Sequence, residues 1–383
     1  MLGISASIFN EAGSLVKDWL KNPLNTSFFY WYFLPVVGFI LLQLFIIGPA
    51  LGRPAPPVFN LEVAQGKGAA DLILEILNAS FFTLILLPLV AGVVLSVLSS
   101  RVLRLYQGTL PIARPFFQPL LSRNRKRNTE LYGPLLVMRR QYLFLVSQRV
   151  RLEVVNGEEK AANVSDEELP ALLDQLKQDT QALHDKLESD PTAPDLPKDI
   201  DRVGATDLAN TLALAEEYPF ERYAMDTALF WPRLVAEIEP EKLDGIKSSF
   251  GAMNGLLNVS LLIYLLAIEL VIVGTAIAAG WTRAAAAPLA PTLQSGRLLA
   301  ALAFVAALIS VLVAFGAYRA AVSSARALGN AMRTAFDYYR GSVLHRFNLK
   351  MPNDIEEERV AWLKLAAFIR RGESFYYPSE FRS

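Results

Sequence analysis

The stretch LLAALAFVAALISVLVAFGAY, residues 298–318, decides the fold of this chain. It contains no charged residue, and it is long enough to cross a bilayer as a helix, which takes about 20 residues. Similar apolar runs occupy residues 28–50, 79–99 and 256–280. Because a bilayer core offers the backbone no water to bond with, each run is expected to be a helix that satisfies its own amides. The sequence therefore predicts a mainly α-helical, polytopic membrane protein with four transmembrane helices.

The composition suits a membrane protein with sizeable water-exposed parts. Of the 383 residues, 53% are hydrophobic and 19% are charged, and the mean hydropathy is +0.31. Cysteine is absent, which excludes disulfides, zinc thiolate sites, iron–sulfur clusters and cysteine nucleophiles. The two histidines, His184 and His345, are far apart in the sequence. We therefore predict neither a metal site nor a cofactor.

Charge is distributed unevenly, although the net charge is zero. Seven basic residues and no acid lie in residues 101–129, whereas residues 153–201 carry fourteen acids and four lysines. Basic residues also precede the first apolar run and follow the fourth, but the loops at 51–70 and 281–297 hold only two each. By the positive-inside rule, both termini and the large middle segment are expected to face the cytoplasm.

These patterns divide the chain into five segments. Residues 1–27 are expected to form an amphipathic helix, 28–100 the first two transmembrane helices, 101–253 a largely helical cytoplasmic domain, 254–320 the third and fourth transmembrane helices, and 321–383 a cytoplasmic helical extension and tail.

Several helices are expected outside the bilayer. Their ranges are residues 205–218, Pro240 onward into the third apolar run, about 297 to 347 as one helix, and Asp354 to about Arg371. A serine cap followed by acids predicts a further helix from Ser165. Residues 131–155 fit either strands or a long helix.

The fourth apolar run and its continuation carry a repeat of seven residues. Small residues, which let another helix approach closely, recur along one line at Ala303, Ser310, Ala317 and Ser324. Arginines follow the same period two residues away, about 200° around the helix, at Arg319, Arg326, Arg333 and Arg340. This basic face is expected to be solvated, to bind anionic lipids near the membrane together with Arg101 and Arg104, or to pair further out with the acidic segment at 153–201.

Glu269 lies in the middle of the third apolar run, where a carboxylate is costly. One interpretation is an ion or proton site, or a ring of such carboxylates lining a pore. The other is a neutral acid that hydrogen-bonds to a neighbouring helix, with Gln43 and Asn258 as possible partners. Gln43, Asn258 and Asn78 are the other polar side chains in or near the runs, and interhelical hydrogen bonds account for them.

The segment EEYPFERYAMDTALFWPRL, residues 216–234, is dense in aromatic and charged side chains. Arg222 and Asp226 are one helical turn apart and can pair. One interpretation is a binding site in which Arg222 and Arg233 clamp a small anion or nucleotide and aromatic rings such as Trp231 stack on it. The other is a folding corner, turned at Trp231-Pro232-Arg233, that docks the domain onto the membrane helices.

The same segment resembles a stretch of uncharacterised bacterial four-span inner-membrane proteins. The resemblance rests on eight residues, namely Glu221, Arg222, Tyr223, Asp226, Trp231, Pro232, Arg233 and Leu234. It implies a bacterial inner-membrane protein and carries no activity with it.

Three kinds of function stay open at this point. The first is an oligomeric channel, whose layout is similar in topology alone to large-pore channels of the connexin and innexin type, without their external cysteines. The second is a non-conducting scaffold or sensor that self-associates through the small-residue line and recruits a cytoplasmic partner. The third is a membrane enzyme or transporter. The sequence shows neither a catalytic cluster nor an inverted repeat in its support. We expect a homo-oligomer that binds no nucleic acid.

Overall fold

The computed structural model describes residues 29–43, 86–154, 196–280 and 296–372, with a few single residues between 171 and 182. Four expectations fall largely or wholly outside these residues. They are the amphipathic helix over residues 1–27, Asn78, the acidic helix from Ser165 and the C-terminal tail.

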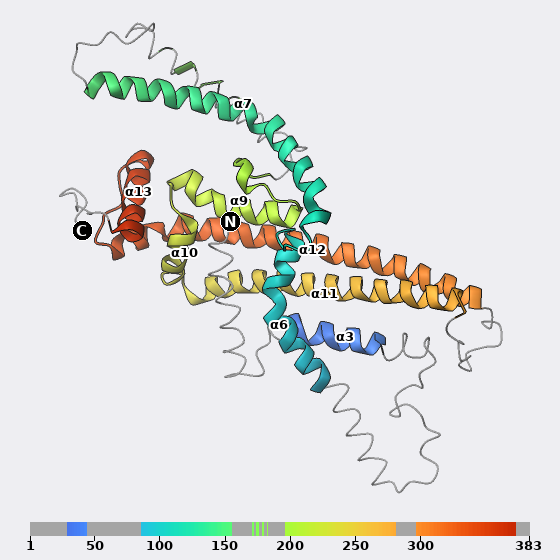
Figure 1. Cartoon of the computed structure of the whole chain (residues 1–383). Helices are drawn as coiled ribbons and strands as arrows, with labels where there is room; N and C mark the ends of the chain where they lie inside the picture. The colour runs from blue at the N-terminus through green and yellow to red at the C-terminus, as the bar shows by residue number, and fades with distance from the viewer. Residues whose placement is uncertain are drawn as a thin grey trace. The chain divides into compact units, whose positions relative to one another are not determined.

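The described residues are mainly helical, as the sequence predicts, and contain no β-strand (Figure 1). The elements are η1 (Phe29–Phe33), α3 (Leu34–Leu42), α6 (Leu87–Tyr106), α7 (Arg114–Val154), η6 (Ile200–Arg202), α9 (Asp207–Tyr223), α10 (Thr227–Val235), α11 (Pro240–Ala278), α12 (Gly296–Arg346) and α13 (Ile355–Arg371).

Three helices of the described part are long and apolar enough to cross a membrane: α6, α11 and α12. The first apolar run is described only for residues 29–43, where η1 and α3 form a shorter apolar helix. The structure thus supports a membrane protein with three helices of spanning length.

The helices α11 and α12 lie side by side and antiparallel (Figure 1). Their contact buries the aliphatic side chains of Leu266, Leu270, Val273 and Ile277 against Ala300 and Ala307. At Gly274 a Cβ atom would lie 3.2 Å from the Cβ of Ala303, so only glycine fits this approach without a shift of its neighbours. Small residues therefore set the spacing of this pair.

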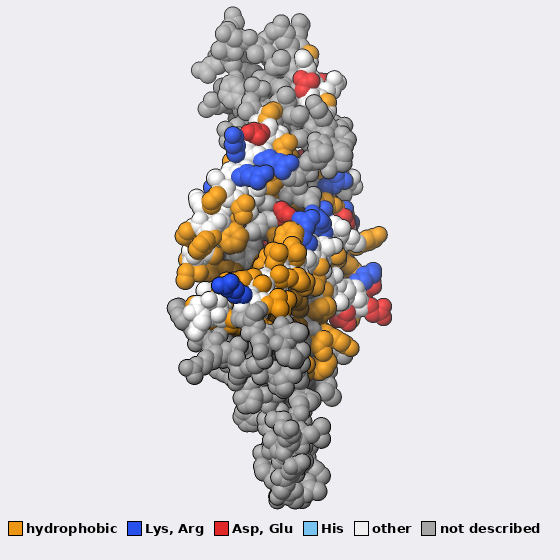
Figure 2. Space-filling model, turned by 90° about the vertical axis from the view of Figure 1, so that its right-hand side faces the viewer, with side chains coloured by type: hydrophobic (Ala, Val, Ile, Leu, Met, Phe, Trp, Pro, Cys, Tyr) orange, Lys and Arg blue, Asp and Glu red, His pale blue; other side chains and the backbone are white. Residues whose placement is uncertain are grey.

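The outer surface of these helices is hydrophobic. Figure 2 shows a broad hydrophobic area with lysine and arginine side chains at its border. On α12, large hydrophobic side chains are exposed from Leu298 to Phe315. We call residues 298–315 the apolar half of α12 and residues 319–346 its polar half. Exposed aliphatic surface of this extent is typical of a helix that faces lipid.

The chain divides into two compact units, of which one is residues 111–214 and the other comprises residues 1–110 and 215–383. In the first unit, Asn124 and Asn128 of α7 fasten the segment that precedes α9: their Nδ2 atoms donate to Gly204 O at 3.0 Å and to Pro197 O at 2.6 Å. Residues 215–253, which were expected in the cytoplasmic domain, belong to the second unit.

Several expected helix boundaries are confirmed. The helix α11 runs unbroken from Pro240, α12 is a single helix, and α13 begins after Asp354, whose Oδ1 accepts from Glu357 N at 2.8 Å. Up to Val154, the stretch left open between strand and helix belongs to α7.

The expected corner at Trp231-Pro232-Arg233 is wrong, because these residues lie inside α10. The chain turns earlier, at Ala224, whose φ of 56° is left-handed. Asp226 then caps α10 by accepting from Leu229 N at 3.0 Å, so the new helix starts at Thr227, four residues before Trp231.

Candidate functional site

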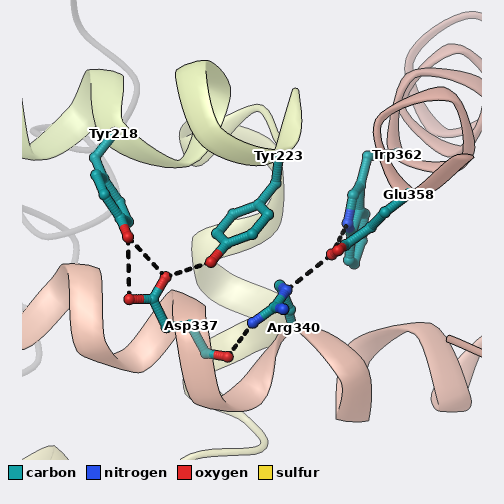
Figure 3. A network of polar contacts seen from close by, with 6 residues as sticks. All are labelled: Tyr218, Tyr223, Asp337, Arg340, Glu358 and Trp362. Atoms are coloured by element: carbon teal, nitrogen blue, oxygen red, sulfur yellow. Dashed lines mark hydrogen bonds and ion pairs between the residues drawn. The ribbon is translucent and has the colours of Figure 1, made fainter. Parts of the chain in front are cut away.

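A polar network joins three helices of the second unit (Figure 3). We call it the Asp337 network, and it consists of Tyr218, Tyr223, Asp337, Arg340, Glu358 and Trp362. The first two residues belong to the end of α9, the next two to the polar half of α12, and the last two to α13. The network therefore connects segments far apart in the sequence.

Asp337 is the acceptor for two tyrosine hydroxyls. Tyr218 Oη lies 3.0 Å from each carboxylate oxygen of Asp337, and Tyr223 Oη donates to its Oδ1 at 2.6 Å. The two rings meet edge to face, with centroids 6.4 Å apart. In each contact the phenol hydroxyl is the donor and a carboxylate oxygen is the acceptor.

The protonation of these phenols follows from their surroundings. Burial is the largest cause that raises the pKa of Tyr223, and its hydrogen bond to Asp337 raises this pKa further, whereas the nearby Arg340 charge opposes the rise. The pKa of Tyr218 is also raised, by burial first and then by Asp337. Both phenols are thus held as neutral donors.

Arg340 joins α12 to α9 and to α13. Its guanidinium carbon lies 4.4 Å from the centroid of the Tyr223 ring, and its Nε donates to Glu358 Oε1 at 2.9 Å. Glu358 is almost fully buried and accepts a second bond, from Trp362 Nε1 at 3.1 Å. Arg340 also donates to the backbone carbonyl of Asp337. The buried carboxylate is therefore both paired and hydrogen-bonded.

Aromatic contacts and a second ion pair hold α13 in place. Trp362 is fully buried and meets Phe230 of α10 edge to face, with centroids 4.9 Å apart. Arg370, near the end of α13, pairs with Asp226 at the start of α10. The middle and the end of α13 therefore contact α10, while Glu358 in its first turn pairs with Arg340 of α12.

The expectation of a solvated basic face on α12 is wrong for its outer part. Arg340 is half-buried in the Asp337 network, and Arg333 lies over the Tyr218 ring, 5.5 Å from its centroid. Arg319 and Arg326 are exposed, as are Arg101 and Arg104 of α6.

The four residues proposed for a binding site in segment 216–234 differ in exposure and in their contacts. Arg222 is exposed, whereas Trp231 is buried and its ring lies 5.8 Å from that of Phe336 on α12. Arg233 donates to Leu229 O at 2.6 Å within α10.

Asp226 pairs with Arg370 rather than with Arg222, because α9 ends before it and the two residues do not share a helix. Trp231 and Asp226 thus fasten α10 to α12 and α13.

Glu269, on the apolar stretch of α11, has a partner in the same chain. Gln43, which follows α3, donates from Nε2 to Glu269 Oε2. This contact is expected if Glu269 forms a hydrogen bond to a neighbouring helix. Asn258 is 1% exposed, and neither polar atom of its side chain has a hydrogen-bond partner in the described structure.

A second polar contact, which the sequence analysis missed, joins α6, α11 and α12. Tyr106 Oη donates to Ser260 Oγ at 2.8 Å, and Ser260 Oγ donates to Ala314 O at 2.8 Å. The rings of Tyr106 and Tyr318 stack with centroids 5.8 Å apart. Serine and tyrosine hydroxyls of this kind hold helices together where water is scarce.

The small-residue line of α12 is used within the chain. Its expected members Ala303, Ser310, Ala317 and Ser324 are half-buried, whereas the fully buried line lies three residues away, at Ala300, Ala307, Ala314 and Ala321. Ala303 faces Gly274 of α11. At Ala303 the line thus packs α12 against its own hairpin partner.

In the part of the chain that the structure describes, no three histidine, aspartate or glutamate side chains are grouped so as to hold a metal ion. Comparisons with protein-family models, with curated proteins and with solved structures find no match for this chain.

Proposed function

We propose that this chain is a non-conducting membrane scaffold or sensor, in which α12 couples the bilayer to a helical platform. The platform consists of residues 215–223 of α9 together with α10 and α13. The observation that carries the proposal is that Asp337 and Arg340, which fix α9 and α13, lie on the same unbroken helix as the exposed apolar half of α12. A tilt or rotation of this helix in the membrane therefore moves the platform.

The dimensions of α12 fit this role. Its apolar half is about 27 Å long at 1.5 Å per residue, which is close to the thickness of about 30 Å of a bilayer core. Asp337 lies about 33 Å further along the helix than Phe315. The Asp337 network is therefore expected in water, well away from the hydrocarbon, and by the positive-inside rule the arginines that follow the apolar half support the cytoplasmic side.

The contacts of Glu269 favour a scaffold over an oligomeric channel. A pore lined by this carboxylate needs its side chain to face a water-filled path shared by several subunits. Its partner is instead Gln43 of the same chain, and a hydrogen bond between neighbouring helices accounts for a polar group at this depth. The resemblance of residues 221–234 to bacterial inner-membrane proteins suggests the bacterial inner membrane as its location.

Ion flux and native mass together test the proposal. We expect liposomes that contain the purified protein to pass no more potassium or chloride than protein-free liposomes, and we expect a monomer or dimer in nanodiscs. A flux whose selectivity changes in Glu269→Gln, carried by a closed ring of several subunits, overturns the scaffold. Glu241→Gln is the matched control, because Glu241 is exposed on α11 outside its apolar stretch.

A further inference from the structure

One exposed line of α12 changes from aliphatic to basic at a single point. Leu298, Val305 and Leu312 are 43%, 54% and 62% exposed, and the next two positions at the same spacing of seven are Arg319 and Arg326. Seven residues are nearly two helical turns, so these side chains share one face. The change marks the edge of the surface that hydrocarbon can cover.

The end of α6 lies at the same point. Tyr106, its last residue, stacks on Tyr318, which directly precedes Arg319. Arg101 and Arg104 belong to the last turns of α6, and both are exposed. They follow exposed valines on α6, so here too aliphatic surface gives way to arginine. Basic side chains from two helices therefore gather at one level.

The arginines of α12 differ in their exposure along the helix. Arg333 and Arg340 are engaged with tyrosine rings and, for Arg340, with a buried carboxylate. Arg319 and Arg326 are exposed and lie nearer to the apolar half. Arg326 is about 10 Å further from the apolar half than Arg319, which is about one Debye length at 0.1 M salt.

We propose that Arg101, Arg104 and Arg319 bind the phosphate groups of anionic phospholipids in the leaflet that borders the polar half of α12. A guanidinium donates two parallel hydrogen bonds to a phosphate, and the long side chain reaches the head-group level while its methylenes stay among acyl chains. The inference rests on the membrane placement of α12 in the proposed function, but not on the scaffold role.

The association of spin-labelled lipids with the reconstituted protein tests the proposal. We expect labelled phosphatidylglycerol to associate more strongly than labelled phosphatidylcholine, with a preference that falls as salt is added. Each arginine at the surface contributes up to about fivefold. The triple variant Arg101→Gln, Arg104→Gln, Arg319→Gln should bring the ratio close to one, and Arg326→Gln should change it less than Arg319→Gln.

A matched control removes three positive charges elsewhere: Lys247→Gln, Lys350→Gln and Lys364→Gln. All three lysines are exposed and lie outside the apolar half of α12. This control should keep the preference. The inference is overturned if the wild type shows no preference for phosphatidylglycerol, or if that preference survives in the triple arginine variant. A protein that is extracted from liposomes by alkaline carbonate overturns the membrane placement itself, so the two failures are distinguishable.

Discussion

The hydroxyl of Tyr223 lies 2.6 Å from Oδ1 of Asp337, although the two residues are 114 positions apart in the sequence. Tyr223 ends α9, and Asp337 lies on the polar half of α12. Together with Tyr218, this contact determines how the end of α9 sits on α12, and the first prediction follows from it.

Removing the Asp337 carboxylate should loosen the end of α9. In Asp337→Ala the hydroxyl of the buried Tyr223 loses its acceptor, which costs about 2 kcal/mol in the free energy of local opening. Hydrogen exchange of the amides at the end of α9, in nanodiscs, measures this. Asp337→Asn, which keeps one oxygen acceptor, should lose less. Asp244→Ala removes an exposed carboxylate and should change exchange little. Unchanged protection in Asp337→Ala contradicts the account.

Trp362 should anchor α13 to the platform. Truncating this fully buried side chain in Trp362→Ala costs about 3–5 kcal/mol, which is enough to release α13 from Phe230 and Arg340. The cleavage rate of residues 347–354 by a protease should then rise. Leu363→Ala is the matched control on the same helix, because Leu363 is 51% exposed. Equal cleavage rates for the two variants show that α13 is not held by Trp362.

Gly255 should be needed for the approach of Trp31. A Cβ atom at Gly255 would overlap the Trp31 ring, and one at Gly251 would lie 2.9 Å from its Nε1. Gly255→Ala should therefore destabilise the packing of η1 on α11 by about 1–3 kcal/mol, seen as a lower melting temperature in detergent.

Two further variants check this explanation. Gly316→Ala should be neutral, because no atom lies within 4 Å of the added Cβ. Combining Gly255→Ala with Trp31→Leu should relieve most of the effect, because the indole ring that the new methyl group overlaps is then absent. If the double variant melts lower by the sum of both changes, the overlap is not the cause.

Alkaline pH should weaken the platform through its tyrosines. The raised pKa of Tyr223 means that the folded state holds the phenol proton more tightly than the unfolded chain, whose pKa is about 10. Below pH of about 10 both states keep the proton and the contribution is fully present, and above it the stability falls as pH rises.

The hydrogen-exchange protection of amides at the end of α9, measured from pH 8 upward and corrected for the intrinsic exchange rate at each pH, tests this loss of stability. Tyr223→Phe should show a smaller decline, and Tyr338→Phe, at an exposed tyrosine of α12, should behave like wild type. Protection that rises above pH 10 in the wild type contradicts the assigned direction.

Much of the helical layout could be predicted from the sequence. The extent of α12, the start of α11 at Pro240 and the start of α13 after Asp354 follow from local signals: apolar periodicity, a proline in the first turn and an aspartate cap. The corner lies at Ala224 and not at Pro232, because the capping side chain of Asp226 starts α10 and Pro232 is accommodated inside it.

The Asp337 network could not be predicted in the same way. Its hydrogen bonds between different helices join residues that are 18 to 119 positions apart, and no local pattern says which arginine of a regular track meets Glu358. The seven-residue period showed that Arg319 and Arg340 share a face of α12. Only the packing of α9 and α13 on one end of that face distinguishes the half-buried Arg333 and Arg340 from the exposed Arg319 and Arg326.

The most direct test of the account asks whether the platform moves as one body with the membrane helix. Because the chain has no cysteine, spin labels can be placed at Leu312→Cys on α12 and Lys364→Cys on α13, both at exposed positions. In nanodiscs, pulsed electron paramagnetic resonance should give one narrow distance distribution, which broadens when Asp337→Ala and Arg340→Gln are added. A distribution that is broad from the start, or that those two changes leave narrow, contradicts the coupling of α12 to the platform.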